Sequence, residues 1–447
     1  MLNKIKSFAK EFLDKTEKHN TLIISHFDTD GITSAAILGR CFKKLDRKFS
    51  FRIIKSLDKE TIEALPKDRV LVFLDLASSS IEFISNLSNK TIFIIDHHEI
   101  KQNQVFPENL HILNPHLHDN GEEMSNACLT YLICKEMDKK DNSMANLAVI
   151  GTVGDLMETK LGPLANSILK DSDLTIKKGF LLYPSTRPLN KALEYCSNPY
   201  IPGVTGNSLG TLDLLREANI QFTKQGYKSL MELDEDEMQR LVTAIALRMP
   251  NPDKMINFIG NLFLVKFFNK LEDARELSAL INACSRMGES NICLLFCMGN
   301  ETARKHAESI YIRYKQSLIE ALNHVSTNPK IEGNQYVILN AKDKIQDTII
   351  GTVASIMSMS TLYKEGTVII TMAYNQDKIK ISSRICGRGR QEEDPRNLRD
   401  FMNEITELIG GESGGHKFAA GCIIDKEKES AFIELVKRKL DIEIVKI

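Results

Sequence analysis

The sequence predicts an α/β protein with a doubly wound, mostly parallel sheet, followed by a helical insertion and a smaller C-terminal α/β domain. One observation is a pair of apolar runs without alternation, Val70–Leu76 and Thr91–Ile95. Such runs are typical of strands buried on both faces, as in a parallel sheet covered by helices. A second is the strand–helix–strand order that precedes them. A third is the length of 447 residues, which exceeds one ordinary hydrophobic core.

The first domain is expected to alternate helices and strands from its beginning. The N-terminal MLNKIKSFAKEF has the spacing of an amphipathic helix and lacks the apolar core of a signal peptide. Thr21–Ser25 is a short β-rich run, Ile32–Lys44 has helical spacing, and Phe49–Lys55 is strand-like. This order is the one expected of a doubly wound sheet.

A turn-rich stretch, Tyr183–Gly210, separates the first domain from the rest. Residues 211–328 look mainly helical and include a long amphipathic candidate, Glu301–Val325. We therefore expect domains at 1–205, 206–330 and 331–447. The last domain is expected to have strands near Tyr336–Asn340, Thr367–Ala373 and Lys378–Ser382 and a closing helix near Glu429–Leu440.

Composition and charge limit the class of protein. Apolar residues make up 43% of the chain and charged residues 26%, as in a soluble globular protein. The sequence has no apolar run of about 18 residues, so we expect no membrane span. The nine scattered cysteines favour a reducing cytoplasm over a disulfide framework. Because the net charge is −1, a nucleic-acid partner would need a local basic groove.

Acidic and histidine residues stand at the points where three predicted strands end. The carboxyl ends of parallel strands meet at one edge of an open α/β sheet, and ligands bind at that edge. We therefore expect these side chains to lie together. They are His26, Asp28 and Asp30 after the first strand, Asp75 at the end of the Val70 run, and Asp96, His97 and His98 after the Thr91 run.

The spacing and the residue types indicate a site for two divalent cations. In extended chain, residues i, i+2 and i+4 face the same way, so His26, Asp28 and Asp30 would share a face, with neighbours about 7 Å apart. Clustered carboxylates repel one another unless cations lie between them. Mixed carboxylate and imidazole ligands suit Mn²⁺, with Mg²⁺ as an alternative.

Simpler interpretations apply to parts of this pattern. The DTDG tetrapeptide alone is often a solvated turn. An EF-hand fits poorly, because the sixth loop position counted from Asp28 is Thr33 and the twelfth is Gly39. The apolar surroundings of Cys293 and Cys297 favour buried thiols over a zinc site. A solvated turn does not account for acidic clusters at three strand ends, so we prefer the metal site.

Four motifs, taken in order, resemble those of the DHH phosphoesterases: HFDTDG, DLA, DHH and GTVGD, the last of which contributes Asp155. The C-terminal GGESGGHKFAAG resembles the substrate-binding domain of that superfamily, although Glu412 and Ser413 interrupt the usual glycine run. Within the superfamily, the archaeal RecJ-like exonucleases are similar, and some of them associate with the GINS replication complex. The stretches that carry this second likeness are Thr186–Gly206, Asp273–Cys284 and Ile349–Ser358.

The resemblance implies a role for each residue of the acidic cluster. His98 would lie beside the scissile phosphate, and Asp96 would orient an imidazole. Two Mn²⁺ ions would activate a water for in-line attack on phosphorus and neutralise charge on the phosphate oxygens. One ion would be held by His26, Asp28 and Asp75, and the other by Asp30, Asp75, His97 and Asp155, with Asp75 bridging.

The resemblance also implies that the C-terminal domain holds the nucleic-acid strand. Its glycines would let backbone N–H groups approach a phosphate closely, and no Gly-Lys-Ser/Thr of a Walker loop follows them. Arg388 and Arg390 lie in a Gly-Arg-Gly-Arg run nearby. The substrate-binding candidates are Ser383, Arg384, Gly414, Gly415 and His416, with Arg275 and Arg286 of the insertion, for which a solvated helix face is an equal alternative.

The expected function is that of a Mn²⁺-dependent exonuclease, a hydrolase acting on single-stranded DNA or RNA in replication or repair. GINS or the replicative helicase complex is a candidate partner. Alternatives are a nanoRNase-type phosphatase of short oligonucleotides, a cyclic-dinucleotide phosphodiesterase, an inorganic pyrophosphatase, and a non-catalytic replisome scaffold related to the eukaryotic helicase cofactor. The length of the chain argues against the nanoRNase type, and the complete set of metal-ligand positions argues against the scaffold.

Overall fold

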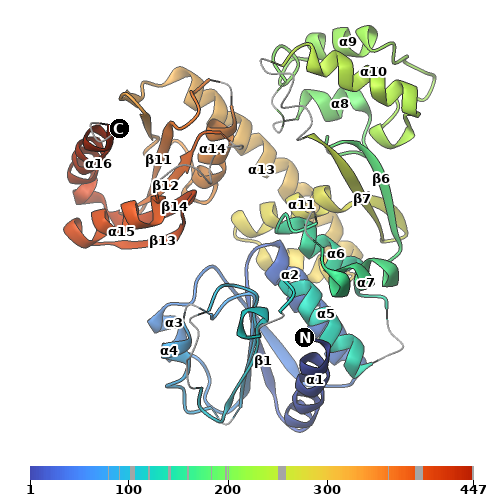
Figure 1. Ribbon diagram of the computed structural model, residues 1–447, viewed down its shortest axis with the longest axis vertical. Coiled ribbons are helices and arrows are strands. Elements are labelled where there is room, and N and C mark those ends of the chain that lie inside the picture. Colours follow the sequence, from blue (N-terminus) through green and yellow to red (C-terminus); the bar gives the residue numbers. More distant parts are fainter. Residues whose placement is uncertain are drawn as a thin grey trace. The chain divides into compact units, whose positions relative to one another are not determined.

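The computed structural model describes residues 1–444 apart from 79, 90, 101–105, 119–120, 139–141, 159–160, 183, 197–198, 200, 250–257, 361 and 388–395 (Figure 1). Arg388 and Arg390 therefore lie outside the described residues. The chain divides into two compact units. The first comprises residues 1–192, 222–238 and 256–311, and the second comprises residues 193–221, 239–255 and 312–447.

A five-stranded, fully parallel sheet forms the centre of the first unit, with the strand order β2-β1-β3-β4-β5. Its register places Ser25 beside Leu74 and Leu74 beside Ile95, so β1, β3 and β4 end at the same edge. The predicted parallel sheet is thus confirmed. The strands are β1 (Thr21–His26), β2 (Phe49–Ile54), β3 (Val70–Leu74), β4 (Ile92–Ile95) and β5 (Leu110–Leu113).

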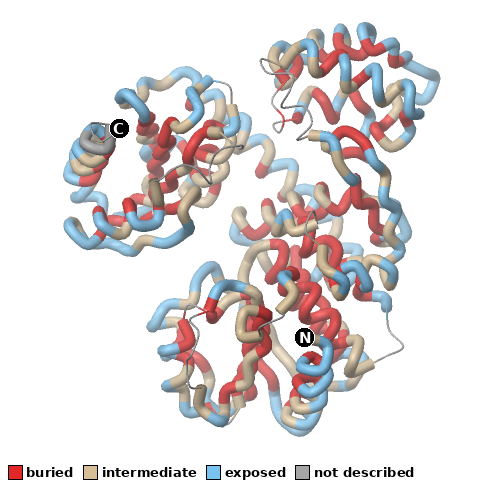
Figure 2. Tube along the Cα trace, viewed as in Figure 1, coloured by how far each residue is buried: buried red, intermediate tan, exposed pale blue. Residues whose placement is uncertain are grey.

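Helices cover both faces of this sheet. Successive side chains of a strand point to opposite faces, so Ile23 and Val72 pack against α1, α2, α5 and α6, whereas Leu22 and Leu71 pack against α3 and α4. Figure 2 shows buried positions running along the strands and along α2 and α5. The helices are α1 (Leu2–Thr16), α2 (Thr29–Lys44), α3 (Lys59–Glu63), α4 (Ile81–Ile84), α5 (Asn126–Met137) and α6 (Ala145–Gly154).

A second, antiparallel sheet with the order β6-β7-β8 also belongs to the first unit. Two of its strands lie in the stretch that we expected to be mainly helical, because a short apolar run such as IGNLFLVKF does not separate a strand from a buried helix by periodicity. The elements of this part of the chain are α7 (Pro163–Asp171), β6 (Leu174–Phe180), α8 (Leu189–Glu194), α9 (Ser208–Glu217), α10 (Glu235–Ala246), β7 (Ile259–Phe267), β8 (Lys270–Asp273), α11 (Ala274–Arg286), α12 (Ser290–Cys297) and the expected long helix α13 (Glu301–Thr327).

The second unit contains a six-stranded sheet in the order β13-β14-β12-β11-β10-β9, in which only the β10–β11 pair is parallel. Phe401 of α15 and Phe432 of α16 pack on one face of this sheet. The predicted strands and the closing helix are confirmed. The elements are β9 (Ile331–Glu332), β10 (Tyr336–Asn340), α14 (Asp347–Met359), β11 (Val368–Asn375), β12 (Lys378–Ile385), α15 (Leu398–Ile409), β13 (Glu412–His416), β14 (Ala419–Asp425) and α16 (Glu429–Ile444).

The structure bears on two expectations from composition, one about membrane-spanning helices and one about the cysteines. In the part of the chain that is described, no helix is both long and apolar enough to cross a membrane. All nine cysteines are buried, including Cys293 and Cys297 of α12. Burial raises the pKa of the Cys293 thiol to about 11, so the thiolate that zinc requires is disfavoured there.

Candidate metal centre

The first acidic segment lies where β1 ends and α2 begins. Asp28 is the N-cap of α2, and one of its carboxylate oxygens accepts the N–H of Gly31 at 3.0 Å. Any larger residue at position 31 would clash, because a Cβ would lie 2.3 Å from the carbonyl oxygen of His26. Asp30 is already in the first turn of α2, so the expected extended spacing of His26, Asp28 and Asp30 is wrong. A tight strand-to-helix turn delivers them instead.

Asp75 follows β3 in a strained backbone conformation. Its φ is +60° and that of Ala77 is +104°, in a region that residues with a Cβ rarely adopt. The N–H of Asp75 donates to the carbonyl of Ile95 at 3.1 Å, which anchors it to the end of β4. Its side chain is 1% exposed. Strain that the surrounding structure maintains is concentrated at functional sites.

The DHH turn after β4 is built around the carboxylate of Asp96. One oxygen accepts the backbone N–H groups of His97 at 2.8 Å and His98 at 3.2 Å, and it also bonds Nδ1 of His98 at 2.8 Å. The other oxygen accepts the N–H of Ser78 at 2.9 Å. Asn114 adds a hydrogen bond to the carbonyl of His98 at 2.9 Å. The imidazole that Asp96 orients is therefore that of His98, while His97 is held through its backbone.

Asp155 is the C-cap residue of α6. Two glycines of α6 allow the helix, and with it Asp155, to come close to the first turn of α2. A Cβ on Gly151 would lie 2.6 Å from Oδ1 of Asp30, and one on Gly154 would lie 2.8 Å from Cβ of Thr29. The GTVGD motif therefore lets α6 pack tightly against the first turn of α2. Without the family resemblance, the sequence offers no signal for this contact.

Asp75 lies between two groups of candidate ligand atoms. Its Oδ2 is 3.5 Å from Nδ1 of His26, and the same nitrogen is 2.9 Å from Oδ2 of Asp28. Its Oδ1 is 3.2 Å from Nε2 of His97, and that nitrogen is 3.3 Å from Oδ2 of Asp155. The two oxygens of one carboxylate thus face the two groups separately.

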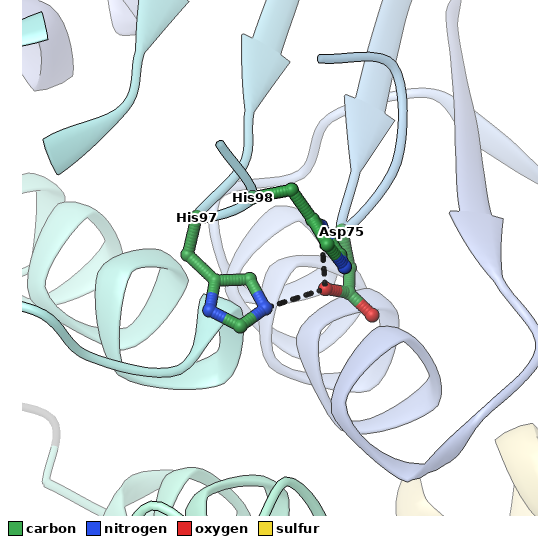
Figure 3. Close-up of side chains that lie close together, drawn as sticks. All are labelled: Asp75, His97 and His98. Atoms are coloured by element: carbon green, nitrogen blue, oxygen red, sulfur yellow. Dashed lines mark ion pairs between the residues drawn. The ribbon is translucent and has the colours of Figure 1, made fainter. Parts of the chain in front are cut away.

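Figure 3 shows the rings of His97 and His98 turned toward the same oxygen of Asp75. Asp30 completes one group, with Oδ2 at 3.8 Å from Nε2 of His97. Within each group, the candidate ligand atoms lie within 4.8 Å of one another. The groups are His26, Asp28 and Asp75; Asp30, Asp75, His97 and Asp155; and Asp75, His97 and His98.

Several buried atoms of this cluster lack a hydrogen-bond partner among the described residues. They are Nδ1 of His26, Nε2 of His97 and both carboxylate oxygens of Asp75. These atoms approach one another, but without the angles of hydrogen bonds. Because buried polar groups are almost always hydrogen-bonded, the atoms indicate a shared ligand. Imidazole nitrogens and carboxylate oxygens that converge in this way fit a divalent metal centre.

The charged side chains of the cluster shift one another's pKa values. Burial alone would lower the pKa of His97, but Asp155 and Asp75 outweigh it and raise that pKa to about 12. Burial and the charge of Asp28 raise the pKa of Asp75 to about 6. Burial, together with Asp155 and Asp75, raises the pKa of Asp30 well above its usual range. The carboxylates thus favour positive charge at the position of the imidazoles, which is also what a divalent cation supplies.

The start of α5 also holds Asp30, and we did not anticipate this contact from the sequence. The N–H groups of Asn126 and Ala127, in the first turn of α5, donate to the two oxygens of Asp30 at 2.6 Å and 2.9 Å. Ser125 is the N-cap of the same helix. The positive end of the helix dipole therefore faces a buried carboxylate. In the sequence, this segment shows only the N-cap serine of a helix and nothing that indicates a contact with Asp30.

Helix α11 contacts the turn between β1 and α2 and carries the two arginines proposed for the insertion. The N–H of Thr29 donates to Oδ1 of Asn282 at 3.1 Å. Arg275 forms an ion pair with Glu158, whose side chain is 5% exposed. Arg286 is half-buried in the last turn of α11.

The C-terminal candidates lie on adjacent strands of the second unit. His416 pairs with Ala419, and Ala419 pairs with Arg384, so the side chains of His416 and Arg384 belong to one row across β13, β14 and β12. The pKa of His416 is lowered by burial and by the charge of Arg384. Gly415 has a φ of +130°, and a Cβ there would lie 2.4 Å from the carbonyl oxygen of Ala419. Gly414 is exposed and unobstructed.

Two hydrogen bonds fix the position of the Arg384 guanidinium. Its Nε donates to Oγ of Ser355 at 3.1 Å, and another nitrogen donates to the carbonyl of Ser383 at 2.7 Å. Ser383 is itself fully buried, and its hydroxyl donates to the carbonyl of Ala420 at 3.0 Å. A contact between Ser383 and a substrate would therefore require this hydroxyl to change its partner.

Three family models match the chain in order. They are the N-terminal domain of the DHH family over residues 20–152, the DHH-CID domain over residues 182–257, and the DHHA1 domain over residues 333–441. The chain belongs to the DHH superfamily. This DHH protein has a RecJ-like fold.

One relative and two solved structures are similar to this chain over most of its length. Uncharacterized protein MJ0831 of Methanocaldococcus jannaschii is 27% identical over 450 residues, which cover 97% of each chain. The structure of Thermus thermophilus RecJ in complex with Mn²⁺ is 17% identical, with a TM-score of 0.60, over 98% of this chain. This chain spans about half (54%) of that RecJ. CDC45 of Entamoeba histolytica is 12% identical, with a TM-score of 0.67, over 97% of this chain and 98% of its own.

Proposed function

We propose that this DHH protein is a Mn²⁺-dependent exonuclease that hydrolyses phosphodiester bonds in single-stranded DNA, with RNA as an alternative substrate and Mg²⁺ as an alternative cofactor. The observation that carries the proposal is Asp75. Both of its buried oxygens lack hydrogen-bond partners within the described parts of the chain, and each faces a separate group of nitrogen and oxygen donors. That arrangement suits a carboxylate shared by two cations.

In this proposal, the residues of the first unit have distinct roles. When bound, the cations would neutralise phosphate charge and activate water. Asp75 would be common to both positions, and Asp96 would fix the ring of His98. The first position would be lined by His26, Asp28 and Asp75, and the second by Asp30, Asp75, His97 and Asp155.

His98 is the side chain best placed to touch the scissile phosphate. It is 56% exposed, whereas His97 is 12% exposed. Its Nδ1 is engaged by Asp96, so Nε2 is the nitrogen directed to a substrate. The hydrogen bond that Nδ1 of His98 donates to Asp96 raises the pKa of His98, which favours the protonated ring and a charge-assisted hydrogen bond from Nε2 to a phosphate oxygen.

We divide the chain into domains at 1–205, 206–330 and 331–447. We assign binding of the nucleic-acid strand to the last of them. Arg384 presents a guanidinium held by Ser355, and guanidinium groups bind phosphates in a bidentate manner. The remaining substrate-binding candidates are Gly414, Gly415 and His416 with Ser383, and Arg275 and Arg286 from α11.

The direct test is digestion of single strands of DNA and RNA labelled at either end, with Mn²⁺ and with EDTA. The proposal predicts release of mononucleotides from single-stranded DNA only with the metal, and the label lost first reports polarity. Cleavage restricted to oligonucleotides of a few residues would favour the nanoRNase alternative. Absence of Mn²⁺-dependent cleavage of any strand would contradict the proposal.

A second candidate function is that of a replisome component, in the cytoplasm and in contact with GINS or the replicative helicase. The similarity to a CDC45 structure over nearly the full length of both chains favours it. The two roles are compatible in one protein. Pull-down with purified GINS at near-physiological salt tests the partner, and no retention would remove this part of the proposal.

A further inference from the structure

Asn126, the first residue of α5, contacts several of the segments that bear the candidate metal ligands. It lies outside the four acidic motifs and is fully buried, at 0% exposure. Its neighbours in space come from the first turn of α2, from the residue after β3 and from the end of β4. These are the segments that carry Asp30, Asp75 and Asp96.

The backbone of Asn126 makes the first of these contacts. Its N–H donates to Oδ2 of Asp30 at 2.6 Å, and the next N–H, from Ala127, donates to Oδ1 at 2.9 Å. Both oxygens of Asp30 are therefore fixed from the same helix start. Each carboxylate oxygen retains a lone pair for another partner.

The side-chain amide makes the remaining contacts. Its orientation follows from the hydrogen-bond network, because only one orientation satisfies both ends. The amide nitrogen donates to the carbonyl of Ile95 at 2.8 Å. The amide oxygen accepts from the N–H of Asp75 at 3.0 Å and from Oγ of Ser34 at 3.1 Å. One planar group thus bonds β4, the residue after β3, and α2.

The contact with Asp75 is the most consequential. Asp75 has a φ of +60°, a conformation that persists only where the surroundings hold it. Its N–H is shared between the carbonyl of Ile95 at 3.1 Å and the amide oxygen of Asn126 at 3.0 Å. Without the amide, one of these restraints is lost and the carbonyl of Ile95 loses a donor.

We infer that Asn126 is a positioning residue of the metal centre: its amide sets the placement of Asp75 relative to Asp30. The inference rests on the proposed metal-dependent function. Asn126 would contact neither a cation nor a substrate. It acts through the backbone of Asp75 and through the α5 helix start, as outer partners of metal ligands do.

The test measures Mn²⁺ affinity directly, from the loss of the EPR signal of free Mn²⁺ on titration with the full-length protein. Asn126→Ala retains the N–H that binds Asp30 and removes only the amide. We expect it to bind Mn²⁺ about tenfold more weakly, the usual size of such effects. Should this variant fail to fold, Ser34→Ala, which removes one partner of the amide, replaces it, with an expected severalfold loss.

Asn89→Ala is the matched control. Asn89 is also a buried asparagine of the first unit, and its amide donates to the carbonyls of Pro66 at 2.8 Å and Arg69 at 3.0 Å, which are not part of the metal centre. It should lose thermal stability but retain wild-type Mn²⁺ affinity. Equal losses of affinity in both variants, or none in Asn126→Ala, would overturn the inference. If the wild type itself binds no Mn²⁺, the proposed function fails first.

Discussion

The two main sheets of this protein present their candidate functional residues in different ways. In the first unit, charged side chains follow β1, β3 and β4, and three of the carboxylates are buried, with Asp30 and Asp96 at 0% exposure and Asp75 at 2%. In the second unit, Gly414, Gly415 and His416 lie on an exposed strand of an antiparallel hairpin. Buried charges need precise partners, whereas an exposed hairpin needs only an accessible backbone and a few cationic groups.

The two sheets therefore suit different functions. At one edge of the first sheet lie a strained residue, a carboxyl group with a raised pKa, and buried polar atoms that lack hydrogen-bond partners among the described residues. The C-terminal hairpin has a glycine with a positive φ and a row formed by Arg384 and His416. We therefore assign chemistry to the first unit and strand binding to the second, a division that substitutions in each unit can test.

The largest expected effect is the loss of catalysis on substituting Asp75. Asp75→Asn keeps the shape of the side chain and removes the shared charge. We expect the rate of Mn²⁺-dependent hydrolysis to fall by at least ~10²–10³-fold. Since Asp75 is buried beside Asp28, the metal-free variant should melt no lower than the metal-free wild type. Near-wild-type hydrolysis by this variant would reject the assignment.

Metal binding should stabilise the two units unequally. With free Mn²⁺ about 100-fold above its Kd, the gain in stability would be about 2.7 kcal/mol. Hydrogen exchange should slow at Asp75, at His97 and in the first turn of α2, and should be unchanged on β13. Slowing that is equal on both sheets would contradict a metal centre confined to the first unit.

Two glycines allow the same comparison with small substitutions. Gly151→Ala places a Cβ 2.6 Å from Oδ1 of Asp30, so we expect a loss of about 1–3 kcal/mol and weaker Mn²⁺ binding. A Cβ at Gly414 would meet no atom within 4 Å, so the free energy of unfolding of Gly414→Ala should equal that of the wild type. Urea unfolding of both variants measures this difference. A greater loss in Gly414→Ala would contradict it.

The smallest expected effect concerns strand binding. Arg384→Ala should raise KM for single-stranded DNA about tenfold, with kcat nearly unchanged, because a phosphate contact is lost while the metal centre stays intact. Lys378→Ala is the control, since Lys378 lies on the same strand and pairs with Asp425. A fall in kcat with unchanged KM would place Arg384 in the chemistry instead.

The sheet and the site could be predicted from the sequence wherever a predicted strand is followed directly by acidic or histidine residues. The parallel sheet and the convergence of Asp28, Asp75 and His97 follow from apolar runs that end in acidic or histidine residues. The local geometry did not follow. Asp30 lies in a helical turn, not in extended chain, because Asp28 caps α2.

Other parts of the site could not be predicted from the sequence, and the reason is physical. Asp155 is brought to Asp30 by helix packing between α6 and α2, and no local pattern encodes such a contact. Asn126 acts through backbone groups of distant segments, which leave no signature in residue type. The strand β7 was missed because its apolar run is as compatible with a helix as with a strand, and β8 was missed because it is a polar segment of four residues.

The most direct test of the account is X-ray diffraction from crystals grown with Mn²⁺, with anomalous data collected at the manganese edge. We predict two anomalous peaks, one beside His26 and Asp28 and the other beside His97 and Asp155, with the carboxylate of Asp75 contacting both. A peak pattern that leaves Asp75 without metal contact, or peaks only elsewhere on the protein, would contradict the account.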